Sequence, residues 1–390
     1  MVDDIIIGYH VFDKSYGSWI PYLRVANSTD GGTTWTTNNI ESSQTWTSTS
    51  IKYIGNSLYF CYLAYGSTTE STGLKFCKSL DKGLTWDTQF ISITNHGSDE
   101  YGSVMACPDE NTIFILTVDT YDYPTYNLRL YRSLDRGSTW TNYVVDIDTW
   151  DSNIEICAPN TNTVFVTYND YNGEKLKFAK STDGGETWTT KTLTDCSVVS
   201  YSETQSICAT DSNNIFIAYC CYLSGPNNLN LATSTDGGAT WSTSLVHAIT
   251  ENRGYMWKVS MTIPDNNNIF IAYHLFDNLN SKRYAALVKS NDGGNTWNVD
   301  IQIGLSEHYF DILAKDPQTL YISHGGAFAY KYGQLYSGST DGGTTWTNNI
   351  VETHDPLLIY VWGYSSITYI PKSTYESTYP GWYSSYGGWT

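Results

Sequence analysis

The feature that most constrains this chain is an eight-residue frame, Ser-x-Asp-x-Gly-x-Thr-Trp, which occurs seven times. The copies, called repeat turns from here on, begin at Ser28, Ser79, Ser133, Ser181, Ser234, Ser290 and Ser339. Successive copies start 51, 54, 48, 53, 56 and 49 residues apart. A period near 50 residues is typical of a repeat architecture, so we expect one structural unit for each copy.

Each fixed residue of the repeat turn has a mechanical reason. The Asp carboxylate can accept hydrogen bonds from backbone N–H groups of its own turn, and the Ser and Thr hydroxyls can do so more weakly. The fixed Gly allows a positive φ, and the closing Trp can cover the turn with apolar surface. The sequence therefore assigns a structural role to the seven aspartates, which are Asp30, Asp81, Asp135, Asp183, Asp236, Asp292 and Asp341.

The segments between the repeat turns have the pattern of β-strands. In the repeat around Ser234, four short runs rich in Ile, Tyr, Phe and Thr cover residues 201–208, 215–219, 229–233 and 241–246. Turn-forming Asn, Asp, Gly and Pro separate them, and no segment shows helical periodicity over ten or more residues. We name these strands A to D and predict an all-β chain with four strands in each repeat.

The two ends of the chain predict how the repeats close. Residues 4–10 align with 268–274, so the first repeat begins at strand B, while residues 362–371 have the pattern of a strand A with no strand B behind it. The C-terminal strand should therefore complete the first blade, which removes exposed sheet edges. The prediction is a single seven-bladed β-propeller of four-stranded blades over 1–371, followed by a Tyr/Ser/Gly/Trp-rich C-terminal tail over 372–390.

The repeat turns resemble those of the Asp-box, or BNR, repeat family. This family includes sialidases, xyloglucanase-type glycosidases and non-catalytic propellers such as photosystem II assembly factors. The resemblance implies that each box joins the third and fourth strands of a blade, on the face away from any catalytic centre. It implies a sialidase-like fold and leaves the function open.

Composition excludes several classes of partner. The net charge of −18 opposes binding to nucleic acid and to anionic lipid surfaces. No stretch approaches ~18 uninterrupted apolar residues, so we expect no membrane insertion. The first residues show no signal-peptide pattern. We expect no cofactor and no metal, because no Cys/His spacing suggests zinc and each repeat turn offers a single carboxylate to calcium.

The sequence does not decide the cellular location of the protein or the redox state of its cysteines. Abundant Tyr, Ser, Thr and Asn with few Lys favours an extracellular or surface-associated protein. The eight cysteines do not suggest a disulfide scaffold, although Cys61 and Cys77 lie on consecutive strands and could pair. Cys107, Cys157 and Cys208 recur at one position of three repeats and read as buried apolar side chains. The sequence gives no oligomeric state.

Strand direction divides the propeller into two faces. A–B turns and repeat turns share one face, and B–C loops and D–A connections share the other, which is the candidate ligand face. Aromatic side chains are expected there in almost every blade, either as wedges between blades or as a platform on which sugars stack. The candidate ligand-binding residues are Trp19, Trp46, Tyr101, Trp150, Tyr201, Trp257, Tyr309 and Trp362, with Arg253 and Arg283 at the rim.

Three functions are compatible with this pattern. The leading hypothesis is a non-catalytic recognition propeller that binds a glycan or a protein partner through the aromatic face. The second is a glycoside hydrolase, sialidase-like or xyloglucanase-like, with a carboxylate pair on that face. The resemblance implies that a true sialidase needs three arginines that converge on a carboxylate, together with an Arg-Ile-Pro motif. The chain has only six arginines and no such motif, so a true sialidase is disfavoured, and no catalytic carboxylate pair can be singled out. The third is a structural or assembly protein displayed on a cell or virion surface, with the tail as its contact.

Overall fold

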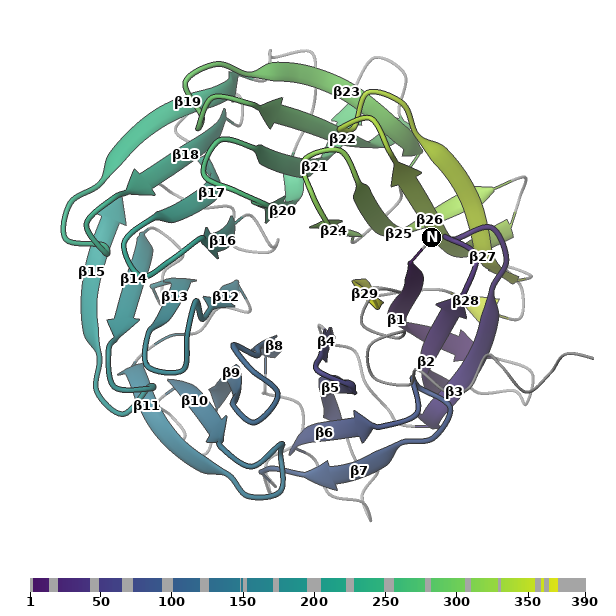
Figure 1. The fold of residues 1–390 in the computed structure, drawn as a ribbon, viewed down its shortest axis with the longest axis horizontal. Helices are drawn as coiled ribbons and strands as arrows, with labels where there is room; N and C mark the ends of the chain where they lie inside the picture. The colour runs from purple at the N-terminus through teal and green to yellow at the C-terminus, as the bar shows by residue number, and fades with distance from the viewer. Residues whose placement is uncertain are drawn as a thin grey trace, which may run out of the picture.

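The chain forms a ring of β-strands around a central axis, shown along that axis in Figure 1. The computed structural model describes residues 3–13, 20–42, 49–64, 73–92, 101–119, 126–147, 149, 153–170, 175–194, 205–221, 228–248, 256–277, 282–305, 310–328, 331–354, 359–360 and 365–370. These residues contain strands and turns and no helix. Seven antiparallel sheets surround the axis, which confirms the predicted seven-bladed β-propeller.

The strands follow one another from the axis outward in each blade. Blades 1 to 3 contain β1 (Asp4–Asp13), β2 (Ile20–Ser28), β3 (Thr36–Ser42), β4 (Ser50–Ile54), β5 (Ser57–Ala64), β6 (Gly73–Ser79), β7 (Asp87–Phe90), β8 (Tyr101–Ala106), β9 (Ile113–Asp119), β10 (Asn127–Ser133) and β11 (Thr141–Ile147). Blades 4 and 5 contain β12 (Ile154–Cys157), β13 (Val164–Asn169), β14 (Leu176–Ser181), β15 (Thr189–Thr194), β16 (Gln205–Ala209), β17 (Ile215–Cys221), β18 (Asn228–Ser234) and β19 (Ser242–Ala248). Blades 6 and 7 and the last strands contain β20 (Met256–Thr262), β21 (Ile269–Asp277), β22 (Lys282–Ser290), β23 (Asn298–Leu305), β24 (Phe310–Ala314), β25 (Leu320–Phe328), β26 (Lys331–Ser339), β27 (Thr347–His354), β28 (Ile359–Tyr360) and β29 (Ser365–Ile370).

Blade 1 is completed by the last strand of the chain. β29 pairs with β1 in an antiparallel register that runs from Asp4 opposite Ile370 to Tyr9 opposite Ser365. The short β28 pairs with the far end of β1. The predicted closure of the ring by a C-terminal strand A is therefore confirmed.

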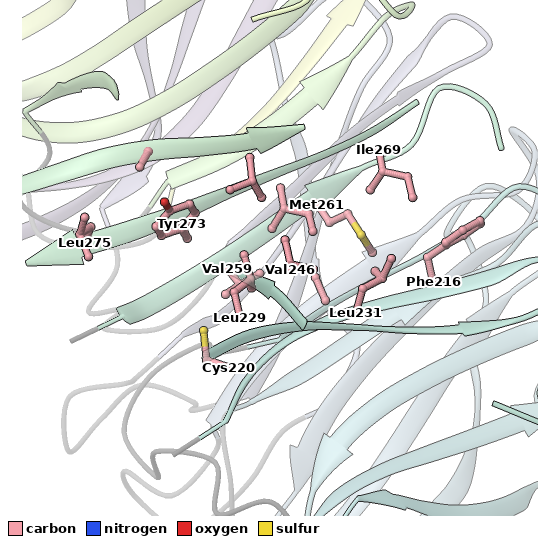
Figure 2. Close-up of a cluster of buried hydrophobic side chains, with 14 residues drawn as sticks. Phe216, Cys220, Leu229, Leu231, Val246, Val259, Met261, Ile269, Tyr273 and Leu275 are labelled. Carbon is pink, nitrogen blue, oxygen red and sulfur yellow. The ribbon is translucent and has the colours of Figure 1, made fainter. Parts of the chain in front are cut away.

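The hydrophobic core lies between neighbouring blades. Strand B is buried along its whole length in several blades, as in β5 and β13, because both of its faces pack against side chains. Figure 2 shows the cluster between blades 5 and 6, where Leu229 and Leu231 of β18 pack with Val259 of β20 and Tyr273 of β21. Each blade therefore contributes side chains to two cores, one shared with each neighbouring blade. This sharing couples the stability of adjacent blades.

The repeat turn is a closed hydrogen-bond network. In blade 4, Ser181 Oγ accepts from the Gly185 N–H at 2.8 Å and donates to Asp183 Oδ1 at 2.7 Å. The other Asp183 oxygen accepts from the Thr187 hydroxyl at 2.5 Å, and Trp188 Nε1 donates to the Gly185 carbonyl at 2.9 Å. The same four bonds recur in the other six turns.

The fixed glycine of the repeat turn also touches the preceding blade. Gly185 has a φ of +90°, and a Cβ built on it would lie 2.2 Å from Leu130 Cδ2 of blade 3. Gly137 is similarly placed against Phe76 of blade 2, and Gly32 of blade 1 lies against Tyr336 of blade 7. The glycine is therefore needed both for its backbone conformation and for the close approach of two blades.

The repeat turns are also linked to one another around the ring. The side chain just before the first Ser of one turn donates to the carbonyl at the fourth position of the next turn. Arg132 donates to the Gly184 carbonyl at 3.0 Å, and Lys180 donates to the Gly237 carbonyl at 2.9 Å. The Gly184 N–H binds the Asn162 carbonyl in the A–B turn of its own blade. The repeat turns and A–B turns thus share one face, as the alternation of strands predicts.

At some boundaries between blades, the carboxylate of an ion pair also accepts a hydrogen bond from a tyrosine hydroxyl. At the boundary of blades 7 and 1, Glu352 accepts a hydrogen bond from the Tyr9 hydroxyl at 2.6 Å and pairs with Arg24. At the boundary of blades 3 and 4, Asp146 accepts from Tyr168 at 2.6 Å and pairs with Lys177. Burial and the neighbouring carboxylate raise the pKa of both tyrosines, so both stay neutral.

The cysteines contribute little cross-linking to the described residues. Cys61 and Cys77 are buried and free, so the pairing that their strands would allow is not made. Cys107, Cys157 and Cys208 are free and only partly buried, which corrects the expectation of full burial. Cys221 is in a disulfide, and its neighbour Cys220 is buried. Among the described residues no helix is long and apolar enough to cross a membrane.

The hydrogen bonds of the repeat turns predict a loss of stability in acid. The Thr hydroxyl and backbone N–H of each turn lower the pKa of six of the aspartates to about 2. The folded pKa lies below the unfolded value of about 3.9, so the stabilisation is complete above that value and is lost as the pH falls towards 2.

Thermal melts at pH 7, 4 and 2.5 measure this effect, and the melting temperature is expected to fall mainly between pH 4 and 2.5. Asp183→Asn should have a lower melting temperature at pH 7 and a weaker dependence on acid. A melting temperature that is the same at pH 7 and pH 2.5 would contradict the role given to the aspartates.

Candidate functional site

Most residues of the predicted ligand face lie outside the described residues. This holds for Trp19, Trp46, Trp150, Tyr201, Arg253, Tyr309 and Trp362. The backbone of Tyr101 begins β8 and that of Trp257 follows the first residue of β20, so both lie where a strand A begins. Arg283 is partly buried near the start of β22, opposite Phe276. These three positions are at the end of the strands that the sequence assigned to the ligand face.

The described residues bring a different group of side chains together around the ring axis. This group, the axial cluster, comprises Lys52 of β4, Glu155 of β12, Lys258 of β20 and Asp311 of β24. All four lie on strand A of their blades, and these strands are the innermost in Figure 1. Glu155 interacts electrostatically with the other three, although they belong to blades 2, 6 and 7. Four separate blades therefore contribute charged side chains that interact electrostatically with Glu155 or include it.

Asp311 is held by the inner strands on both sides of it. Its carboxylate accepts from Ser260 Oγ of β20 at 2.9 Å and from Ser366 Oγ of β29 at 3.1 Å. The Ile367 N–H donates to it at 3.3 Å. Three donors from two neighbouring blades fix the orientation of this side chain.

Glu155 has a different environment. It occupies the same ladder position in its blade as Asp311, since it pairs with Thr167 as Asp311 pairs with Ser323. Within the described part of the chain, its carboxylate makes no hydrogen bond or ion pair. Burial raises the pKa of Glu155 to about 7, with Lys258 and Lys52 opposing the rise and Asp311 adding to it. Near neutral pH this side chain can therefore both give and accept a proton.

Lys258 completes the electrostatic arrangement. Burial lowers its pKa, and the carboxylates of Glu155 and Asp311 work in the opposite direction. The axial cluster carries two acidic and two basic side chains, so the formal charges cancel when all four are ionised. Such a cluster offers hydrogen-bond donors and acceptors without a strong preference for anions or cations.

Two buried polar atoms beside the axial cluster have no partner in the described residues. They are Thr167 Oγ1 and Gln205 Oε1. Thr167 lies directly opposite Glu155 in the ladder, so both side chains are on one face of the sheet. Gln205 begins the neighbouring β16 and uses its amide N–H to bind the Asn153 carbonyl at 2.8 Å. Buried oxygens of this kind usually bind a donor such as water or a ligand hydroxyl.

The sequence pattern contained a weak signal for the axial cluster. Glu155, Ser206, Ser260 and Asp311 occupy equivalent ladder positions and recur at intervals of 51, 54 and 51 residues. Their side chains differ, so the periodicity of this position is hidden when only one residue type is followed. Among the described residues, no group of three or more His, Cys, Asp and Glu side chains has an arrangement suited to a metal ion.

Comparison with known proteins identifies the fold alone. No family model and no curated protein matches this sequence. Among solved structures, an ulvan lyase of polysaccharide lyase family PL25, bound to a GlcA–Rha3S saccharide, matches with a TM-score of 0.58 and 12% identity over 80% of this chain and 87% of its own. The α-L-arabinofuranosidase Arb93A from Fusarium graminearum, in complex with an iminosugar inhibitor, matches with a TM-score of 0.51 and 14% identity over 88% of this chain and 97% of its own. A Hadza microbial sialidase matches with a TM-score of 0.45 and 16% identity over 69% and 60% of the two chains.

Proposed function

We propose that this protein is a glycan-binding propeller whose ligand approaches the ring axis from the end where strands A begin. The observation that carries the proposal is the axial cluster, in which Glu155, Lys258 and Asp311 converge from three blades. Sugar hydroxyls both donate and accept hydrogen bonds, so they suit a cluster that contains both acidic and basic side chains. Thr167 Oγ1, which has no partner in the described residues, lies beside this cluster.

The aromatic residues assigned from the sequence complete this proposal. Tyr101 and Trp257 lie at the beginnings of strands on the same end of the ring, and aromatic faces stack on the apolar faces of sugars. Two proteins of similar fold have a saccharide or an iminosugar bound, which supports the same class of ligand here. The same proposal includes two further points: the repeat turns are Asp boxes, and the protein is extracellular or surface-associated.

A second candidate function is glycoside hydrolysis, and one observation favours it. Glu155 and Asp311 are two carboxyl groups in different environments. Glu155 has a pKa of about 7 and Asp311 is fixed by three donors. A carboxyl group with a raised pKa can protonate a leaving oxygen, while a second carboxylate activates water or attacks the sugar.

A glycan array followed by variant proteins tests the binding proposal. Glu155→Gln and Trp257→Ala are each expected to weaken binding about tenfold, since a hydrogen bond to a charged group or a stacked ring contributes roughly 1.5 kcal/mol. The matched control is Glu186→Gln, because Glu186 is an exposed acid on the repeat-turn face, paired with Arg132 at 2.9 Å. Its affinity should equal that of the wild type.

The same proteins separate the two candidate functions. Glycan retention by the wild type without turnover of chromogenic glycosides supports recognition. Hydrolysis is supported if the wild type turns over a chromogenic glycoside, if the rate changes with pH near pH 7, and if Glu155→Gln loses this turnover. The glycan proposal fails if the wild type retains nothing on the array, or if both variants bind as well as the control.

A further inference from the structure

Two adjacent repeat turns depart from the other five in the same way. The turns of blades 2 and 3 have Leu80 and Leu134 at the second position, where the other turns have Thr or Asn. Their fourth position is Lys82 or Arg136 in place of Gly, and the sixth position of the blade 2 turn is Leu84. These changes give two neighbouring turns an apolar surface that the others lack.

The three leucines are exposed on these two adjacent turns and are together named the leucine patch. Leu80, Leu84 and Leu134 are 66%, 71% and 59% exposed. Among the described residues, the non-glycine residues with positive φ are Lys82 at 61° and Arg136 at 59°, a conformation that side chains oppose. The glycines at the same position of the other five turns also have a positive φ, between +66° and +73°, so this conformation belongs to the turn itself.

Contacts on both sides hold the two turns in place. Lys82 Nζ lies 3.2 Å from Asp4 of blade 1, and Arg136 pairs with Glu110 at 2.6 Å. Lys78, just before the blade 2 turn, is within 3.5 Å of the Arg136 carbonyl in the blade 3 turn. The leucine patch therefore spans two turns whose positions are fixed relative to each other.

The last described strand ends next to this patch. Ile370 of β29 is paired with Asp4, and the following residue of β1, Ile5, is paired with Ser28, the first residue of the blade 1 repeat turn. β29 therefore ends on the repeat-turn face. Lys82 of the blade 2 turn contacts Asp4, the ladder partner of Ile370, so β29 ends beside the blade 2 turn.

The residues that follow Ile370 have a composition suited to the leucine patch. Residues 372–390 carry one Lys and one Glu, and their aromatic residues are Tyr375, Tyr379, Trp382, Tyr383, Tyr386 and Trp389. An extended chain spans about 3.3 Å per residue, so ten residues reach roughly 33 Å, which is ample for a neighbouring blade. We propose that segment 372–390 docks on the repeat-turn face and covers the leucine patch with its aromatic side chains.

A second copy of the protein is a less suitable occupant. Each copy carries a net charge of −18, so two copies repel each other, whereas segment 372–390 has balanced charges and is already tethered beside the patch. Tethering raises the effective concentration of the segment to a level that a free partner rarely reaches. The docking is independent of glycan binding, because it uses the opposite face of the ring.

Limited chymotrypsin digestion, followed by intact mass, tests the docking. The protease cuts after Tyr and Trp, and the rate at which residues after Tyr375 are lost reports the undocked population. The patch variant is Leu80→Thr/Leu84→Thr/Leu134→Thr, and the control is Leu245→Thr/Val299→Thr/Ile350→Thr, which changes exposed apolar residues of other blades. The patch variant should lose the segment at least about tenfold faster than the wild type, and the control should not.

Sedimentation velocity distinguishes the alternative occupant. The proposal expects a monomeric wild type, and a chain ending at Lys372 that binds more of an apolar dye than the wild type does. The proposal is overturned if the wild type loses the segment as fast as the patch variant. It is also overturned if the wild type is a dimer that the patch variant dissociates and the shortened chain retains.

Discussion

A chain that ends at residue 361 is expected to lose cooperative folding, whereas a chain that ends at Pro371 is expected to keep it. The first truncation removes β29, which pairs with β1 over six residues. It also removes the buried Ile367 and Ile370 and leaves β1 as an open edge at the ring axis. The second truncation leaves all of these contacts in place.

The energy involved is comparable with the stability of a whole domain. Loss of one buried Ile costs about 2 to 5 kcal/mol, and a domain is stable by only about 5 to 15 kcal/mol. β29 also supplies the Ser366 and Ile367 donors to Asp311, and Thr368 Oγ1 accepts from the Tyr53 N–H of blade 2 at 3.2 Å. Removal of the strand therefore breaks contacts with three blades at once.

Circular dichroism melts and size-exclusion chromatography of the two truncated chains provide the measurement. The longer chain should elute as the full-length protein does and unfold in one transition. The shorter chain should show a broad transition or form large species. A shorter chain that is monomeric with an unchanged melting temperature would show that β29 does not close the ring.

Gly185→Ala is expected to destabilise the protein by roughly 2 to 5 kcal/mol. A φ of +90° costs an L-residue about 1 to 2 kcal/mol, and an added Cβ would lie 2.2 Å from Leu130 Cδ2. Overpacking of this kind typically costs a further 1 to 3 kcal/mol, because either blade 3 or the turn must shift. The effect should appear as a lower midpoint in urea unfolding.

The neighbouring glycine provides a matched control. Gly184 also has a positive φ of +72°, but the equivalent position holds Lys82 in blade 2 and Arg136 in blade 3. A Cβ at Gly184 would lie 3.0 Å from Arg132 Nη1 and 3.1 Å from the Thr161 carbonyl, compared with 2.2 Å from Leu130 at Gly185. Gly184→Lys is therefore expected to cost less than Gly185→Ala, although it also has the cost of the left-handed conformation, about 1 to 2 kcal/mol. Equal losses for the two variants would mean that contact with Leu130 contributes nothing.

The sequence contained enough to predict the fold because the repeat turn couples local and long-range structure. The hydrogen bonds of each turn require its Ser, Asp, Gly and Trp. These residues therefore recur at a spacing that can be recognised in the sequence. The alignment of residues 4–10 with 268–274 then placed the missing strand A at the other end of the chain, and the pairing of β29 with β1 agrees.

The axial cluster was not predicted for a physical reason. Glu155 and Asp311 are 156 residues apart, and only the curvature of the ring brings them towards each other. Their strands are four and five residues long and carry one acid each among apolar residues, which reads as an ordinary strand. Of the residues that were proposed for ligand binding, Arg283 has a described side chain, and it lies partly buried on a strand C.

The contact of each repeat turn with the preceding blade also gives the ring an order of assembly. As the chain is synthesised, Gly137 and Gly185 meet residues of blades that have already emerged, namely Phe76 and Leu130. Gly32 of blade 1 is different, because its partner Tyr336 is made about 300 residues later. The strand A of blade 1 also comes last, so the first blade to leave the ribosome is the last to be finished.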